Sequence, residues 1–86
     1  MPNPRFEALT QQDVIRAARK FQPKEIQKWS VVVEKREYPV KQLLMEAANM
    51  LELPAPRVTP ADFIPHYAVR KFRKLGFTVH YYESGA

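Results

Sequence analysis

The strongest constraint on the fold is an apolar stripe between residues 40 and 51. Six apolar residues recur there at intervals of three and four: Val40, Leu43, Leu44, Ala47, Ala48 and Leu51. This spacing brings all six to one side of an α-helix, because a helix makes one turn every 3.6 residues. Pro39 suits the first helical position, where its missing N–H costs no hydrogen bond. The pattern predicts a core helix over residues 39–52.

A second helical pattern lies nearer the N-terminus. Thr10 is a candidate N-cap, and Asp13, three residues later, completes a pair of the capping-box kind. Apolar residues then follow at helical spacing: Val14, Ile15, Ala18 and Phe21. We predict a helix over residues 10–21. Residues 1–8 contain two prolines and little periodicity, and we interpret them as a flexible N-terminal arm.

The third helix is predicted near the C-terminus. Thr59 is an N-cap candidate that precedes Pro60, and a second proline, Pro65, removes one backbone hydrogen bond from any continuous helix. We therefore expect one turn over residues 60–64 and a helix over residues 65–75. Its buried face would be Ala68, Val69, Phe72 and Leu75. Gly76 fits the left-handed position that ends a helix.

Two stretches have the alternation of β-strands. Residues 27–34 are rich in β-branched and aromatic types, and residues 77–83 alternate apolar and polar side chains. Lys35 and Arg36 follow the first strand, and we interpret them as the tip of a hairpin that continues through Tyr38. The tip lacks the glycine or asparagine that two-residue hairpins favour.

The element order is therefore α-β-β-α-α-β, which predicts a small α+β domain over residues 9–83. Three short strands are expected to form one antiparallel or mixed sheet, with the helices packed mainly on one face. The 86 residues suit a single domain, and a hydrophobic fraction of 45% is too high for a disordered chain. With no cysteine, the sequence excludes disulfides and thiol-based zinc or redox sites. No signal peptide or membrane-spanning run is apparent, so we expect a cytoplasmic protein.

Catalytic patterns are weak throughout the sequence. His66 and His80 lie on different predicted elements, with no spacing typical of metal ligands. Ser30 and Ser84 lie outside any nucleophile turn, and two glycines are too few for a phosphate-cradling loop. We therefore expect a binding module that carries no cofactor and no metal, rather than an enzyme.

The strongest candidate binding feature is a basic cluster on the third predicted helix. Its members are Arg70, Lys71, Arg73 and Lys74, which together span an arc of about 160° opposite the apolar face. No acidic residue interrupts the cluster, so its charges repel one another, and contact with phosphate would relieve that repulsion. The alternative is a basic face that is only solvated. A net charge of +5 (14 basic and 9 acidic residues) agrees with an anionic partner, for which DNA is our first hypothesis.

A second candidate contact region comprises Lys35 and Arg36 at the hairpin tip together with Lys41. Lys41 lies in the first turn of a helix, where the helix dipole disfavours a cation. His80 and Tyr82 could stack on bases from the last strand. The other hypothesis is a protein-interaction or oligomerising module, in which sheet edges and the apolar residues Trp29, Tyr81 and Tyr82 form the interface.

Three short motifs carry a resemblance to a known class of domain. They are the strand Trp29-Ser30-Val31-Val32-Val33 with its turn Lys35-Arg36, the helix opening Tyr38-Pro39-Val40-Lys41, and the helix-to-strand run from Arg73 to Val79. Together they span about residues 28–82. This arrangement resembles small domains found beside restriction-type nucleases, including HNH endonucleases. The resemblance implies an accessory DNA-recognition role, with cutting done elsewhere. The chain departs from that pattern because it lacks the usual turn glycine and carries no nuclease module.

Overall fold

The computed structural model describes residues 4–22, 25–26 and 28–82. In chain order the elements are α1 (Pro4–Ala8), α2 (Gln11–Lys20), β1 (Trp29–Val33), β2 (Arg36–Pro39), α3 (Val40–Asn49), the 3-10 turn η1 (Pro60–Asp62), α4 (Pro65–Lys74) and β3 (Thr78–Tyr81). The three strands form one antiparallel sheet in the order β2-β1-β3. The predicted α+β class is confirmed.

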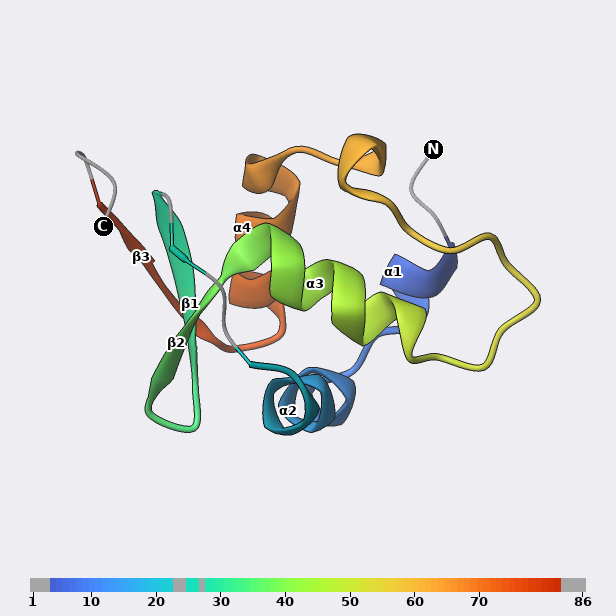
Figure 1. Ribbon diagram of the computed structural model, residues 1–86, viewed down its shortest axis with the longest axis horizontal. Helices are drawn as coiled ribbons and strands as arrows, with labels where there is room; N and C mark the ends of the chain where they lie inside the picture. Colours follow the sequence, from blue (N-terminus) through green and yellow to red (C-terminus); the bar gives the residue numbers. More distant parts are fainter. Residues whose placement is uncertain (1–3, 23–24, 27, 83–86) are drawn as a thin grey trace.

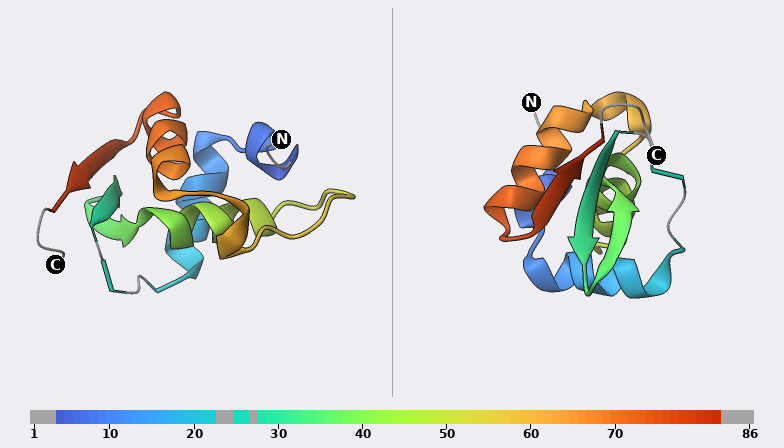
Figure 2. Two further views of the ribbon diagram at one scale, coloured as in Figure 1. Left: turned by 90° about the horizontal axis from the view of Figure 1, so that it is seen from above. Right: turned by 90° about the vertical axis from the view of Figure 1, so that its left-hand side faces the viewer.

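The helices extend from one face of the sheet (Figure 1). Two further views show the same layering, with the strands at one end of the molecule (Figure 2). α3 packs against β1 and β2, whereas α4 packs against β1 and β3. Alternate residues of β1 therefore face the helices, and Val31 and Val33 are fully buried there. The opposite face of the sheet is left without a covering helix among the described residues.

The core helix begins and ends within its predicted range. All the predicted apolar positions from Val40 to Ala48 are buried, and Leu51 packs against the core from just beyond the helix. Pro39 is the N-cap rather than the first helical residue, because it still pairs with Ser30 in the sheet. α3 ends at Asn49, three residues before the predicted boundary.

The ends of α2 and α4 confirm their sequence signals. The Thr10 hydroxyl accepts from the Asp13 N–H at 3.3 Å, and the Asp13 carboxylate accepts from the Thr10 N–H at 2.9 Å. At the end of α4, Gly76 has the predicted positive φ of 95°. The Phe77 N–H donates to the Phe72 carbonyl, and the two rings meet edge to face, which completes a Schellman-type cap.

The predicted flexible arm is wrong for residues 4–8, which form α1 and enter the core. Phe6 is buried because its ring packs against Phe63 and Tyr67, with centroids 5.2 and 5.1 Å away. Arg5 is also buried, and its guanidinium donates to backbone carbonyls in the last turn of α3 and in the chain that follows it. Residues 1–3 of the predicted arm lie outside the described residues.

The hairpin turn is shifted by one residue from its predicted place. Glu34 and Lys35 form the turn with φ values of 50° and 70°, and Arg36 already pairs with Val33. Positive φ at both central residues is what a two-residue hairpin needs to match the twist of its strands. Arg36 is therefore a strand residue, and Lys35 alone of the predicted pair lies in the turn.

Candidate nucleic-acid interface

The basic cluster lies on the side of α4 that faces away from the core. Burial of Ala68, Val69 and Phe72 fixes the orientation of the helix. Arg70, Arg73 and Lys74 are exposed, as predicted from their spacing. No acidic residue occurs within α4, but three of its cations lie in the last turn, where the helix dipole also stabilises positive charge.

Lys71 differs from the other members of the cluster because it is half-buried. Burial lowers the pKa of its ammonium, and the neighbouring charge of Lys74 lowers it further, while Glu7 of α1 opposes the shift. Both lowering effects disfavour the charged form, and a nearby anion would offset them. Lys71 therefore lies at the edge of the exposed surface, whereas the other three cations lie on it.

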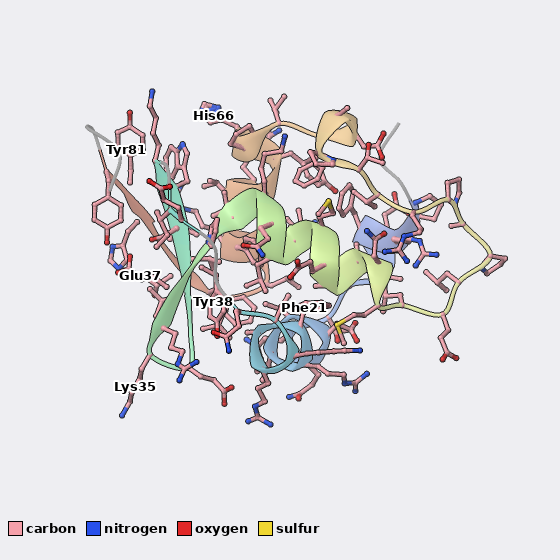
Figure 3. The ribbon with its side chains drawn as sticks, viewed as in Figure 1. Phe21, Lys35, Glu37, Tyr38, His66 and Tyr81 are labelled. Atoms are coloured by element: carbon pink, nitrogen blue, oxygen red, sulfur yellow. The ribbon has the colours of Figure 1, made fainter. Side chains whose placement is uncertain are left out.

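An aromatic cluster adjoins the basic side of α4. The Arg73 guanidinium lies 5.9 Å from the centre of the Trp29 ring, within the range of a cation–π contact. The His66 ring meets Trp29 edge-on at 5.8 Å, and the Tyr81 ring lies 4.6 Å from Trp29. Tyr81 comes from β3, where it pairs with Trp29 across the sheet, and half of its surface is exposed. Figure 3 shows Tyr81 and His66 at the same end of the molecule. We call Trp29, His66, Arg73 and Tyr81 the aromatic–basic cluster.

The second predicted contact region is not brought together by the fold. Lys35 projects from the hairpin tip at the lower edge of the view, whereas His66 lies at its upper edge (Figure 3). The tip is tied to α2, because the Arg19 guanidinium donates two hydrogen bonds to the Glu34 carboxylate at 2.7 and 2.8 Å. These bonds lower the pKa of Glu34 and raise that of Arg19. Arg36 lines a small cleft between the hairpin and the end of α2.

Lys41 lies apart from the hairpin tip, at the other end of β2. Its ammonium donates to the Pro60 carbonyl oxygen at 2.6 Å and lies 5.0 Å above the Phe63 ring. These contacts join the start of α3 to η1. They give Lys41 a structural partner at a helix position that the dipole disfavours.

A polar cluster occupies the uncovered face of the sheet. The Glu37 carboxylate accepts from the Ser30 hydroxyl at 2.7 Å and from the Tyr82 hydroxyl at 2.5 Å. The Tyr82 bond is the larger cause of a lowered pKa at Glu37, the Ser30 bond adds to it, and a charge on His80 acts in the same direction. The bond to Glu37 also raises the pKa of Tyr82. Tyr82 therefore lies on the opposite face of the sheet from Tyr81. The two tyrosines cannot contribute to the same binding surface.

A groove of about 750 Å³ opens beside the aromatic–basic cluster. Trp29 and His66 form part of its wall, α3 contributes Val40 and Met45, and the start of α4 contributes Pro65. Lys28, Lys41 and Glu25 are the charged residues of the lining. Trp29 therefore touches both the groove and the basic surface of α4.

Comparison with known proteins places the chain in a family. A family model described as SCO5918-like matches residues 4–86, which is nearly the whole chain. The chain belongs to the SCO5918-like family. That description states no activity, ligand or partner. Searches of curated proteins and of solved structures gave no match.

In this SCO5918-like chain, sequence reasoning found the basic cluster but missed its aromatic surroundings. The sequence patterns suggest only a protein interface for Trp29 and Tyr81 and indicate no role for His66. His66 and Arg73 are seven residues apart, which places them on one side of a helix, but only the packing of α4 on β1 brings both to Trp29. Within the described residues, no three His, Asp or Glu side chains come together as a metal site, and no helix is long and apolar enough to cross a membrane.

Proposed function

We propose that this protein is a non-catalytic module that binds nucleic acid, with DNA as its first candidate. The observation that carries the proposal is the acid-free set of exposed cations on α4, flanked by the aromatic–basic cluster. Arg70, Lys71, Arg73 and Lys74 would contact phosphates, and neutralising those phosphates releases bound counterions. Aromatic rings next to cations are a common arrangement in proteins that bind nucleic acid.

The proposal concerns binding that is largely independent of base sequence. Apart from Pro65, the exposed side chains of α4 are cations and His66, and the proposal assigns the cations to phosphates. Contacts to phosphate fix the position of a protein on nucleic acid without reading the bases. A cytoplasmic location is part of the same proposal.

A charge-matched pair of variants tests the proposal. In the first, Arg70, Arg73 and Lys74 become Gln; in the second, the exposed residues Arg16, Lys20 and Arg57 become Gln. Each leaves 11 basic residues against 9 acidic, so the two variants have the same net charge. Binding of labelled duplex and single-stranded DNA is measured at several salt concentrations by fluorescence anisotropy.

Wild-type affinity is expected to fall steeply with salt. The α4 variant should bind much more weakly, and the slope of log affinity against log salt should become shallower by about 2 to 3, at roughly 0.7–0.9 per lost phosphate contact. The charge-matched control should keep most of the wild-type affinity. Equal losses in both variants would show that net charge alone matters, and salt-independent binding would contradict a phosphate interface.

A second candidate is a protein-interaction module, which the exposed apolar residues favour. Ile64 and Tyr81 are 62% and 50% exposed, and β3 has one edge unpaired within the described sheet. Such an edge can accept a strand of another chain. A molecular mass that rises with protein concentration in light scattering, without any effect of added DNA, would favour this function over the first.

A further inference from the structure

We infer that the nucleic acid bound at α4 is single-stranded, and that its unpaired bases stack on Tyr81 and Trp29. The inference rests on the proposed function and names the class of ligand. The observations behind it are the exposure and packing of the Tyr81 and Trp29 rings and the groove beside Trp29.

The two rings form a stacking surface at the edge of the sheet. Tyr81 is half exposed on an edge strand, and its ring lies 4.6 Å from that of Trp29 at an angle of 50°. Because Tyr81 is exposed beside Trp29 and next to the cations of α4, a base can reach its ring face. Stacking of a base on such a ring commonly contributes a factor of about 5 to 150 in affinity, whichever base is involved.

The cations of α4 are placed to hold the phosphates of the same strand. Arg73 lies within 5.9 Å of the Trp29 ring, so a base against Trp29 would have its backbone close to this guanidinium. Arg70 lies one turn before Arg73 and Lys74 follows it, so positive charge continues along the exposed side of α4. One strand can therefore contact the rings through its bases and α4 through its phosphates.

The groove provides room for a base beside Trp29. Its volume of about 750 Å³ lies in the range of small-ligand sites, and its wall is built from Trp29, His66, Val40, Met45 and Pro65. An apolar wall with two flat rings suits the face of a nucleobase. Lys28 and Lys41 at the groove outnumber the single acid, Glu25, so the groove also tolerates an anionic backbone.

These features favour a single strand over a duplex. In a duplex, the faces of the bases are covered by their neighbours, and proteins reach only the base edges in the grooves. Stacking on Trp29 and Tyr81 requires faces that are free, as they are in an unpaired strand. A duplex could use the cations of α4 but would leave the rings and the groove unused.

The test compares a single strand with a duplex on the full chain. The probes are an oligothymidine of about 12 nucleotides, within the usual site size for such modules, and a duplex of the same length. Affinity is measured by anisotropy of the labelled probe at near-physiological salt. The fluorescence of Trp29, the only tryptophan in the chain, is recorded with unlabelled probes as an independent signal. Three variants accompany the wild type: Tyr81→Ala, Tyr81→Phe, and Tyr82→Ala as a control on the opposite face of the sheet.

The expected result is that oligothymidine binds about tenfold or more tightly than the duplex and quenches Trp29. Tyr81→Ala should lose about tenfold in affinity for oligothymidine with little change for the duplex, whereas Tyr81→Phe and Tyr82→Ala should stay close to the wild type. The inference is overturned if the duplex binds as tightly, Trp29 fluorescence does not change, and Tyr81→Ala has no effect. In that case the triple substitution in α4 would still weaken both probes, and the proposed function would stand. Absence of binding by either probe at low salt would overturn both.

Discussion

At the scale of single residues, the Arg5 side chain holds five backbone carbonyl groups. It is 93% buried, and its guanidinium donates hydrogen bonds of 2.6–3.3 Å to the carbonyl oxygens of Ala48, Leu51, Leu53, Ala55 and Pro56. Ala48 lies in the last turn of α3, where carbonyls lack partners within the helix and the helix dipole favours a cation. One side chain of α1 thus fixes both the end of α3 and the start of the long connection to η1.

We expect Arg5→Ala to lower the free energy of unfolding by about 3 kcal/mol or more. The substitution removes the guanidinium donors from five carbonyl oxygens in a buried or part-buried site. Hydrogen bonds to a charged group contribute about 1.5–3 kcal/mol each, and less where water or a backbone N–H replaces the donor. Urea unfolding measures the change. Arg57→Ala, an exposed arginine beside the same loop, serves as the control and should change stability by no more than about 0.5 kcal/mol. Equal effects of the two substitutions would contradict the structural role of Arg5.

The contrast between Arg5 and Thr10 shows which residue roles the sequence can reveal. Thr10 caps α2 through Asp13, three residues away, so the signal is contained in a short window. The partners of Arg5 lie 43 to 51 residues away, and nothing in the first eight residues points to them. An arginine near two prolines therefore resembled part of a loose arm, although it lies in the core.

At the scale of elements, the residue types in the hairpin turn do not suit the backbone conformation that the turn adopts. Glu34 and Lys35 both have positive φ, a region that costs non-glycine residues roughly 1–2 kcal/mol. Glu34, the first residue of the turn, forms an ion pair with Arg19 of α2. Both side chains of that pair are largely exposed, so the pair contributes little to offset the strain.

We expect Lys35→Gly to raise the free energy of unfolding by about 0.5 kcal/mol. Relief of the left-handed conformation exceeds the extra chain entropy that glycine brings to the unfolded state. Arg36→Gly is the matched control, because it removes the neighbouring cation from a paired strand position, where glycine should cost about 0.5–1 kcal/mol. Thermal and urea unfolding of the two variants should shift in opposite directions. Destabilisation by both would contradict the strained turn.

Elements whose ends carry a chemical signal were predicted closely from the sequence. The end of α4 was found through Gly76, and α3 was found through its apolar stripe. The hairpin turn was misplaced by one residue because neither Glu34 nor Lys35 belongs to a type that marks positive φ. The strand order β2-β1-β3 follows from pairing between distant segments, which short local patterns do not encode.

At the scale of the whole molecule, the candidate interface combines predicted and unpredicted parts. The cations of α4 follow from helical spacing alone. The aromatic–basic cluster needs three arrangements at once: the pairing of Trp29 with Tyr81, the packing of α4 on β1 and β3, and the seven-residue spacing of His66 and Arg73. Only the spacing of His66 and Arg73 can be recognised in a short stretch of sequence. The cluster as a whole therefore cannot be predicted without the folded structure.

The dimensions and core of the molecule predict that it unfolds as one unit. Its radius of gyration of 11.9 Å is close to the roughly 12 Å expected for a folded chain of this length. One buried cluster joins residues from α1, α2, β1, β2, α3 and α4, including Phe6, Val14, Val31, Leu44 and Phe72. These elements therefore bury their apolar residues against one another, and small domains of this kind usually unfold in a single transition.

Two spectroscopic signals test this cooperativity. Trp29 fluorescence reports the contact of the sheet with α4, and far-ultraviolet circular dichroism reports the helices. Their urea transitions should coincide, because both depend on the same core. Phe72→Ala should shift both midpoints together, since loss of a fully buried phenylalanine costs about 3–5 kcal/mol. The exposed substitution Arg57→Gln should leave both midpoints in place. A Trp29 transition at lower urea than the helical signal would mean that the sheet and α4, which together form the proposed interface, separate before the rest of the core unfolds.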